Sequence, residues 1–218
     1  MAELYYFNTE GISMDELNNR GVLKPACPYK KEKYRENPNK KGVAASLLGD
    51  VLIRKGISDL TGKRLYDIKL ERNKHGKPQL KEGCGLHFNL SHSANYIIAA
   101  FSEYRIGVDI ERIRNINLKI ARNMFTQEEY DYITKTSSDK MKLMHFYQIW
   151  TLKESYMKAV GKGLTLPLDS FSVVRGSKVL KELTHEFMLE LVPIHLHYQL
   201  AVCFNRNDQI NKVHFLRL

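Results

Sequence analysis

The segment from about Lys140 to Val160 constrains the fold most, because its apolar residues recur with helical spacing along its whole length. The apolar stripe consists of Phe146, Ile149, Trp150, Tyr156, Met157 and Val160. Gly161 and Gly163 follow the stripe and predict the end of the helix. The pattern therefore predicts one long helix with a buried face.

Shorter segments surround this helix and predict a mixed fold. Strands are expected at 4–7, 66–72, 86–90, 96–101, 106–110, 171–174, 187–191, 198–204 and 213–216. Further helices are expected at 28–37, 39–55, 118–124 and 127–133, with Gly56 as the stop of the second of these. The order predicts an α+β protein of two similar-sized halves, 1–104 and 105–218, without a sequence repeat between them.

Composition narrows the class of protein. The 218 residues, 43% of them hydrophobic, suffice for one domain or for two of about 100 residues. A formal charge of +10 favours a polyanionic partner, which could be a nucleic acid, an acidic protein or a phosphate-rich small molecule. Three separated cysteines indicate neither a disulfide framework nor a zinc site. Because no run of about 18 apolar residues occurs, we expect a cytoplasmic protein without a membrane segment.

Asp109 and Glu111 are the first candidates for chemistry. They lie two apart on an expected strand, so both carboxylates share one face while Val108 and Ile110 point into the core. Two such charges about 4 Å apart repel by roughly 4 kcal/mol at an effective dielectric of 20, and a hard divalent cation removes that cost. The pair favours Mg²⁺ or Mn²⁺, although an isolated Asp-x-Glu is more often a solvated strand face.

Glu154 and Lys158 are neighbours on one face of the long helix, since they lie four residues apart. An ordinary exposed ion pair would have the same spacing. The more specific interpretation gives the metal a third carboxylate and places a cation one turn away to balance phosphate charge.

Two turn-like segments carry further polar groups. Ser91 and His92, within Asn-Leu-Ser-His-Ser, could hydrogen-bond a phosphate at a strand end. The second segment consists of His75, Gly76, Lys77 and Pro78. Its glycine lets a ligand approach the backbone closely, and its lysine supplies a positive charge. Either segment alone is also compatible with ordinary turn chemistry.

The order of these motifs resembles the 4′-phosphopantetheinyl transferase superfamily, in its surfactin-synthetase-activating type. The shared motifs are the Ser46-Leu-Leu-Gly-Asp helix, Gly-Lys-Pro, Asn-Leu-Ser-His-Ser, Gly-Val-Asp-Ile-Glu, Phe-Thr-x-x-Glu and Trp-x-x-Lys-Glu-Ser-x-x-Lys. They extend over essentially the whole chain. The resemblance implies two halves related by a pseudo-twofold axis, and transfer of phosphopantetheine from coenzyme A to a carrier-protein serine.

The resemblance also implies roles for individual residues. Asp109, Glu111 and Glu154 correspond to the metal ligands, and Lys158 to the phosphate-contacting lysine. Ser91 and His92 correspond to a phosphate-binding pair, and residues 75–78 to the loop that holds the adenine. Lys30, Lys33 and Ser46 correspond to positions that reach the phosphates of the nucleotide. The first half would thus bind the nucleotide, and the second the metal and the carrier.

One position departs from the family pattern. Relatives have one or two basic residues immediately before the hydroxyl residue of the Leu-Leu-Gly-Asp helix, where this chain has Ala44 and Ala45. The departure leaves one contact to the 3′-phosphate without its usual residue. Lys40 and Lys41 lie about one turn earlier and are candidates to replace the charge.

Glu154 is the preferred general base for the implied reaction, and Glu129 is the second choice. The acyl or peptidyl carrier protein is expected to dock on Ile116–Phe125, where apolar residues are mixed with cations. The family type implies a monomer.

A nucleic-acid-binding module is the alternative that the charge supports. Against it, the aromatic residues do not alternate with basic ones as a single-strand stacking surface requires. A catalytically idle relative is the other alternative, and the intact acids and Lys158 argue against it.

Overall fold

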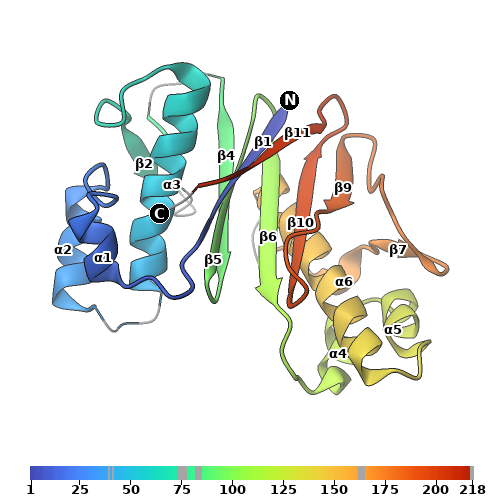
Figure 1. Cartoon of the computed structure of the whole chain (residues 1–218). Coiled ribbons are helices and arrows are strands. Elements are labelled where there is room, and N and C mark those ends of the chain that lie inside the picture. Colours follow the sequence, from blue (N-terminus) through green and yellow to red (C-terminus); the bar gives the residue numbers. More distant parts are fainter. Residues whose placement is uncertain (39, 41, 73–77, 82–84, 162–164, 217–218) are drawn as a thin grey trace. The chain divides into compact units, whose positions relative to one another are not determined.

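The computed structural model describes residues 1–218 except 39, 41, 73–77, 82–84, 162–164 and 217–218. The chain divides into two compact units, Met1–Tyr104 with Ile210–Leu218, and Arg105–Gln209 (Figure 1). The last strand therefore belongs to the first unit, whereas the expected second half ran to residue 218. The reason is that β11 (Ile210–Phe215) pairs in parallel with β1 (Ala2–Asn8).

The first unit is built on a four-stranded sheet with the order β11-β1-β5-β4. Strand β5 (Tyr96–Ser102) runs antiparallel to both β1 and β4 (His87–Ser93). Every residue of β5 is buried, and all but the last, Ser102, are apolar or aromatic. Helix α3 (Val43–Thr61) packs on this sheet.

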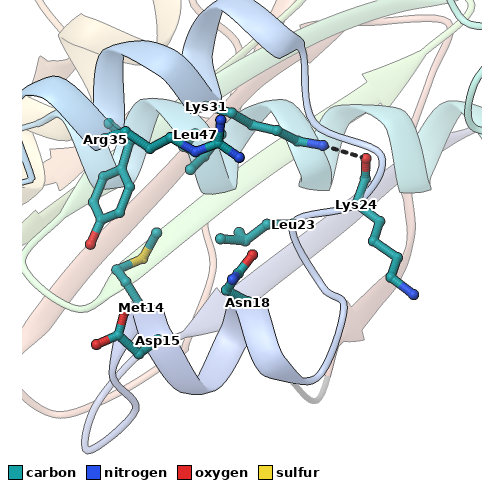
Figure 2. A pocket seen from close by; sticks show the side chains of 9 residues that line it. Met14, Asp15, Asn18, Leu23, Lys24, Lys31, Arg35 and Leu47 are labelled. Carbon is teal, nitrogen blue, oxygen red and sulfur yellow. Dashed lines mark hydrogen bonds between the residues drawn. The ribbon is translucent and has the colours of Figure 1, made fainter.

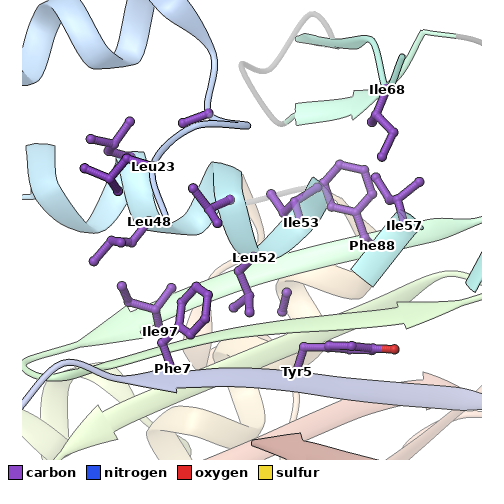
Figure 3. Close-up of a cluster of buried hydrophobic side chains, with 14 of the residues drawn as sticks. Tyr5, Phe7, Leu23, Leu48, Leu52, Ile53, Ile57, Ile68, Phe88 and Ile97 are labelled. Carbon is purple, nitrogen blue, oxygen red and sulfur yellow. The ribbon is translucent and has the colours of Figure 1, made fainter. Parts of the chain in front are cut away.

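The core of the first unit lies where α3 meets the sheet (Figure 3). Leu52, Ile53 and Ile57 of the helix pack with Tyr5 and Phe7 of β1 and with residues of the other strands. Apolar residues recur on α3 at three to four positions, so one face of the helix is buried against the strands.

Helix α3 differs at both ends from the expected helix over 39–55. It begins after Gly42, whose φ of 84° only glycine adopts easily, and it ends at Gly62, with a φ of 71°. Gly56 was wrongly expected to be the stop. It lies inside the helix, where an added Cβ would come within 2.3 Å of the Phe101 ring, so glycine is needed there for close packing.

The remaining elements of the first unit are short. They are α1 (Met14–Asn19), α2 (Pro28–Glu36), which has proline in its first turn, and the antiparallel pair β2 (Leu70–Arg72) and β3 (Pro78–Leu80). The strand expected from Tyr66 is therefore shorter than predicted. A turn in which the N–H of Asp67 donates to the carbonyl of Arg64 replaces its first residues.

The second unit is built on a three-stranded antiparallel sheet with the order β6-β10-β9. Its strands are β6 (Ile106–Arg112), β9 (Phe187–Leu191) and β10 (Tyr198–Asn205). The long helix α6 (Asp139–Val160) packs on this sheet (Figure 1). Ser138 caps its start, and Gly161, with a φ of 78°, ends it as predicted.

Short elements complete the second unit. They are the 3₁₀ helices η1 (Leu118–Ile120) and η3 (Leu168–Ser170), helices α4 (Ala121–Met124) and α5 (Gln127–Thr134), and strands β7 (Val174–Arg175) and β8 (Lys178–Val179). The helix expected over 118–124 is thus two short turns, and the strand expected over 171–174 begins only at Val174. None of the helices in the described ranges is long and apolar enough to cross a membrane.

Candidate active site

Asp109 and Glu111 lie on the face of β6 that packs against α6. Gly107 is on the same face, since strand residues alternate, and an added Cβ there would lie 1.9 Å from the carbonyl oxygen of Ser155. Val108 and Ile110, on the opposite face, are fully buried, as predicted. The glycine therefore allows helix α6 to approach the strand that carries both acids.

Lys158 of α6 forms an ion pair with the buried carboxylate of Asp109. The distance from Lys158 Nζ to Asp109 Oδ1 is 2.6 Å, and the same ammonium donates to the carbonyl oxygen of Val108 at 3.1 Å. The sequence had allowed an ordinary surface pair between Lys158 and Glu154. Instead, the Lys158 ammonium contacts the β6 acid.

Glu154 faces the same group of charges. Burial raises the pKa of its carboxyl, the carboxylates of Asp109 and Glu111 raise it further, and the Lys158 ammonium lowers it. The four residues that the sequence singled out on β6 and α6 are therefore brought together. We call Asp109, Glu111, Glu154 and Lys158 the acid cluster.

The acid cluster supplies carboxylate oxygens, which hard divalent cations prefer. Within the described residues, however, no three His, Cys, Asp or Glu side chains have an arrangement that could already hold a metal ion. In this arrangement the Lys158 ammonium contacts the Asp109 carboxylate.

Glu129, the second candidate for a general base, has a different environment. Its side chain is fully buried and forms an ion pair with Lys153, with 2.9 Å between Lys153 Nζ and Glu129 Oε1. Glu129 also accepts hydrogen bonds from the backbone N–H groups of Val173 and Thr126, the latter as part of a capping box at the start of α5. These contacts give Glu129 a structural role.

Lys153 was missed by the sequence analysis. Its side chain is completely buried, and burial lowers the pKa of its ammonium group. A signal was present, because Lys153 lies four residues after Ile149 and four before Met157, within the apolar stripe of α6. A lysine at a buried helical position predicts a buried anionic partner.

In the first unit, Lys30 and Ser46 lie side by side. Lys30 Nζ donates to the carbonyl oxygen of Ser46 at 3.0 Å and lies 3.5 Å from Asp50 Oδ1. The buried Asp50 also accepts from the N–H of Cys27 at 2.7 Å and from Arg54 Nε at 2.9 Å. Asp50 therefore ties the start of α2 to α3 and brings together two of the residues expected at the nucleotide.

Ser91 and His92 point to opposite faces of β4, because they are adjacent in a strand. His92 is exposed and shares its face with Leu90, which lies against Gly49 of α3. Gly56, further along α3, lies against Phe101, which pairs with Phe88. Helix α3 thus runs antiparallel to β4, so the end of α3 that carries Ser46 faces the end of β4 that carries His92.

Some of the other residues expected at the nucleotide lie in the described part of the chain. Lys33 is exposed on α2, and Lys40 is exposed beyond it. Pro78 begins β3. His75, Gly76, Lys77 and Lys41 lie outside the described residues.

A separate pocket lies between α1, α2 and α3 (Figure 2). Its volume is about 250 Å³, and Lys31 and Arg35 of α2 line it, whereas Lys30 and Lys33 do not. Lys31 Nζ donates to the carbonyl oxygen of Lys24 at 2.7 Å, as the dashed line in Figure 2 shows. Helix α2 therefore presents different lysines to the pocket and to Ser46.

In the segment expected to dock the carrier, Ile116–Phe125, most of the apolar side chains pack against the core. Phe125 is buried, and Ile116, Leu118 and Met124 pack against the core of the second unit. Ile120 is 41% exposed. The cations Arg114, Lys119 and Arg122 are exposed as well.

Two known protein families together match most of the chain. The profile of the 4′-phosphopantetheinyl transferase superfamily matches residues 105–208, and that of the 4′-phosphopantetheinyl transferase N-terminal family matches residues 27–103.

Individual relatives give the same result. The chain is 39% identical over 184 residues to the 4′-phosphopantetheinyl transferase ffp of Bacillus subtilis, with 82% of each chain covered. It is 40% identical over 167 residues to the 4′-phosphopantetheinyl transferase Sfp of the same species (strain 168), covering 75% of this chain and 74% of the relative. A rat L-aminoadipate-semialdehyde dehydrogenase-phosphopantetheinyl transferase is 27% identical, covering 83% of this chain and 67% of the relative.

Proposed function

This chain belongs to the 4′-phosphopantetheinyl transferase superfamily, and from that premise we propose that it moves the phosphopantetheine arm of coenzyme A onto a serine of an acyl or peptidyl carrier protein. The observation that carries the proposal is the acid cluster, in which β6 and α6 bring three carboxylates and one lysine together. Adenosine 3′,5′-bisphosphate is the second product.

Asp109, Glu111 and Glu154 are the residues that would hold a magnesium ion, with manganese as a substitute. The donor set fits, because all three offer carboxylate oxygens and because the pKa of Glu154 is raised by burial and by the other two acids. Such an ion, when bound, offsets the negative charge of the pyrophosphate.

The protein's own groups then act on the serine and the leaving phosphate. The serine Oγ bonds to the β-phosphorus, and the bond from that phosphorus to the bridging oxygen breaks. Glu154 is the preferred acceptor of the serine proton, directly or through a water molecule, because its carboxylate lies in the acid cluster, beside the position proposed for the pyrophosphate. Lys158 offsets charge that develops on the leaving phosphate.

The first unit is proposed to bind the nucleotide. Lys30 and Ser46, with His92 at the facing end of β4, are the groups proposed for the 3′-phosphate. Lys33 and Ser91 are proposed for the remaining phosphates, and residues 75–78 for the adenine. The contact between Lys30 and the Ser46 backbone supports a nucleotide site without the basic residues that relatives carry at positions 44 and 45.

The carrier is proposed to dock on Ile116–Phe125, where exposed cations suit an acidic partner. We further propose that the protein acts in the cytoplasm as a monomer. Free thiols at Cys27 and Cys203 are compatible with a reducing compartment.

Transfer can be tested by incubating the protein with coenzyme A, Mg²⁺ and a panel of apo-carrier proteins, and then measuring the mass of each carrier. We expect a mass increase equal to one phosphopantetheine on at least one carrier, and no increase when EDTA replaces the metal. Unmodified carriers throughout the panel would contradict the proposal.

A further inference from the structure

Lys153 and Glu129 form an ion pair in which both side chains have an exposed fraction of 0%. Removing two charges from water is costly, and replacing such a pair with apolar residues is often neutral or stabilising. Stability alone therefore gives no reason for this pair. Its contacts indicate what else it does.

The Lys153 ammonium uses all three of its N–H groups within the protein. It donates to Glu129 Oε1, to the carbonyl oxygen of Leu168 at 2.6 Å and to that of Phe171. Its Nζ also lies 4.1 Å from the centre of the Phe171 ring. The ammonium group therefore has a defined position.

Glu129 extends this network to two further backbone segments. It accepts from the N–H of Val173 at 2.8 Å and from that of Thr126 at 3.0 Å. The pair thus joins three parts of the second unit: helix α6, the start of α5, and the segment 168–173. We call Lys153, Glu129 and these backbone partners the buried clamp.

The buried clamp acts on the helix that carries the acid cluster. Lys153 directly precedes Glu154, and successive helical residues are turned by about 100° from one another. Ser155 and Ala159 contact β6 at Gly107, where there is no room for a side chain. Helix α6 is therefore fixed at the buried clamp by Lys153, and it packs closely on β6 at Gly107. Glu154 directly follows Lys153.

We propose that the buried clamp positions helix α6 for phosphopantetheinyl transfer. Lys153 and Glu129 fix the rotation of α6 about its axis and its distance from β6, so that Glu154 and Lys158 face Asp109 and Glu111. The inference rests on the proposed function. Within the described part of the chain, the side chains of Lys153 and Glu129 form no hydrogen bond or ion pair with the side chains of the acid cluster, so both are positioning residues. A second function of the clamp, stabilising the unit, is the alternative that the experiment must separate.

The test variant is Lys153→Met with Glu129→Gln, which removes both charges and approximately keeps both side-chain shapes. A single substitution would leave one charge buried without its partner and would destabilise the fold. The matched control is Ile133→Ala, a fully buried residue of α5 in the same unit, which removes packing but no clamp contact.

Three quantities are compared with those of the wild type: the melting temperature, the kcat and KM for coenzyme A with an apo-carrier, and the affinity for Mn²⁺ measured by electron paramagnetic resonance. We expect the double variant to fold, to lose kcat by about 100-fold, as a displacement near 1 Å can cause, and to bind Mn²⁺ more weakly. The KM for coenzyme A should stay close to that of the wild type. Ile133→Ala should lower the melting temperature and keep kcat and Mn²⁺ affinity.

A folded double variant with wild-type kcat and Mn²⁺ affinity would overturn the inference, as would an equal loss of kcat in Ile133→Ala at an equal loss of melting temperature. If the double variant does not fold, Lys153→Arg gives the answer, because it keeps a positive charge beside Glu129 and changes the positions of the donor groups in the clamp. We expect lower kcat and weaker Mn²⁺ binding than in the wild type, and values equal to those of the wild type would overturn the inference.

Failure of the proposed function gives a different result. The wild type would then modify no carrier, while the comparison of Mn²⁺ affinity between wild type and double variant would still show whether the clamp positions the carboxylates.

Discussion

Lys158 and Asp109 form an ion pair of 2.6 Å that joins helix α6 to strand β6. Glu154 lies one turn before Lys158, and both acids of β6 raise the pKa of its carboxyl. The ion pair therefore lies where α6 brings Glu154 to the acids of β6. The proposed metal ligands thus come from two elements that are distant in sequence and held together by a charge contact.

Neutralising any of the three acids should abolish transfer. Asp109→Asn, Glu111→Gln and Glu154→Gln each remove a carboxylate oxygen that we assign to the metal, and we expect kcat to fall by at least about 100-fold. The control is Glu190→Gln, an exposed acid of β9 in the same sheet. Mass spectrometry of the carrier gives the rates, and near-normal turnover at saturating Mg²⁺ would show that the metal assignment is wrong.

Glu154→Gln should also change how stability depends on pH in protein kept free of metal with EDTA. The pKa of Glu154 is raised in the folded state, mainly by burial and then by Asp109, so the folded protein holds this proton more tightly than the unfolded chain. Stability from this group is therefore present below the unfolded pKa and is lost as pH rises through the folded pKa. The glutamine variant does not undergo this loss.

Melting curves between pH 4 and pH 8 check the sign of this effect. The variant should gain melting temperature over the wild type as pH rises, with the full gain above the folded pKa. A wild type that is the more stable protein at pH 8 would contradict the assigned electrostatics.

Much of this cluster was predictable from the sequence, because spacing determines which side chains share a face. Asp109 and Glu111 lie two apart on a strand, and Glu154 and Lys158 lie four apart on a helix. Spacing within one element cannot determine which element lies opposite. The sequence therefore allowed a pair between Lys158 and Glu154, and the structure has one between Lys158 and Asp109.

The errors have the same origin in long-range packing. Gly56 had the position of a helix stop, but its lack of a side chain accommodates Phe101, a residue of another strand. Strand β11 was expected in the second half, and its pairing with β1 places it in the first unit. For Glu129, the second candidate for a base, spacing within one element did not indicate its buried partner Lys153.

Gly107→Ala should displace α6 from β6. An added Cβ would lie 1.9 Å from the Ser155 carbonyl oxygen and 2.5 Å from the Ala159 nitrogen, and both are backbone atoms that cannot move aside alone. We expect a loss of unfolding free energy of about 1–3 kcal/mol, as overpacking usually causes, together with a lower kcat. Urea denaturation measures the loss, and a variant as stable as the wild type would show that the helix does not lie this close.

Lys30→Ala should weaken the binding of coenzyme A more than the binding of dephospho-coenzyme A. We propose that Lys30, beside Ser46, reads the 3′-phosphate, and a charge-assisted hydrogen bond of about 1.5–3 kcal/mol corresponds to a tenfold or larger loss of affinity. Lys31→Ala is the matched control, since the next lysine of α2 contacts the Lys24 carbonyl instead. Lys33→Ala, His92→Ala and Lys77→Ala are also expected to weaken coenzyme A.

Calorimetry with both nucleotides separates these cases. Equal losses for coenzyme A and its dephospho form in Lys30→Ala would remove Lys30 from the 3′-phosphate. Unchanged binding in all of the Lys30, Lys33, His92 and Lys77 variants would argue against the nucleotide site.

Reversing the charge on the proposed docking segment should weaken the binding of the carrier and leave the binding of coenzyme A unchanged. Arg114 and Arg122 are exposed on either side of Ile120, the exposed apolar residue of Ile116–Phe125. Because an acidic carrier helix would be repelled, Arg114→Glu with Arg122→Glu should raise the KM for the carrier and leave the KM for coenzyme A unchanged. Ile120→Asp should have the same effect through lost apolar contact.

The matched control for the charge reversal is Arg175→Glu with Lys178→Glu, which makes the same change of net charge on exposed residues of β7 and β8 in the same unit. Salt separates a docking contact from a general charge effect, because the Debye length falls from about 30 Å at 0.01 M to about 8 Å at 0.15 M ionic strength. The difference between wild type and docking variant should therefore shrink as salt is added. Equal carrier kinetics for wild type and docking variant at low and high salt would place the docking surface elsewhere on the protein.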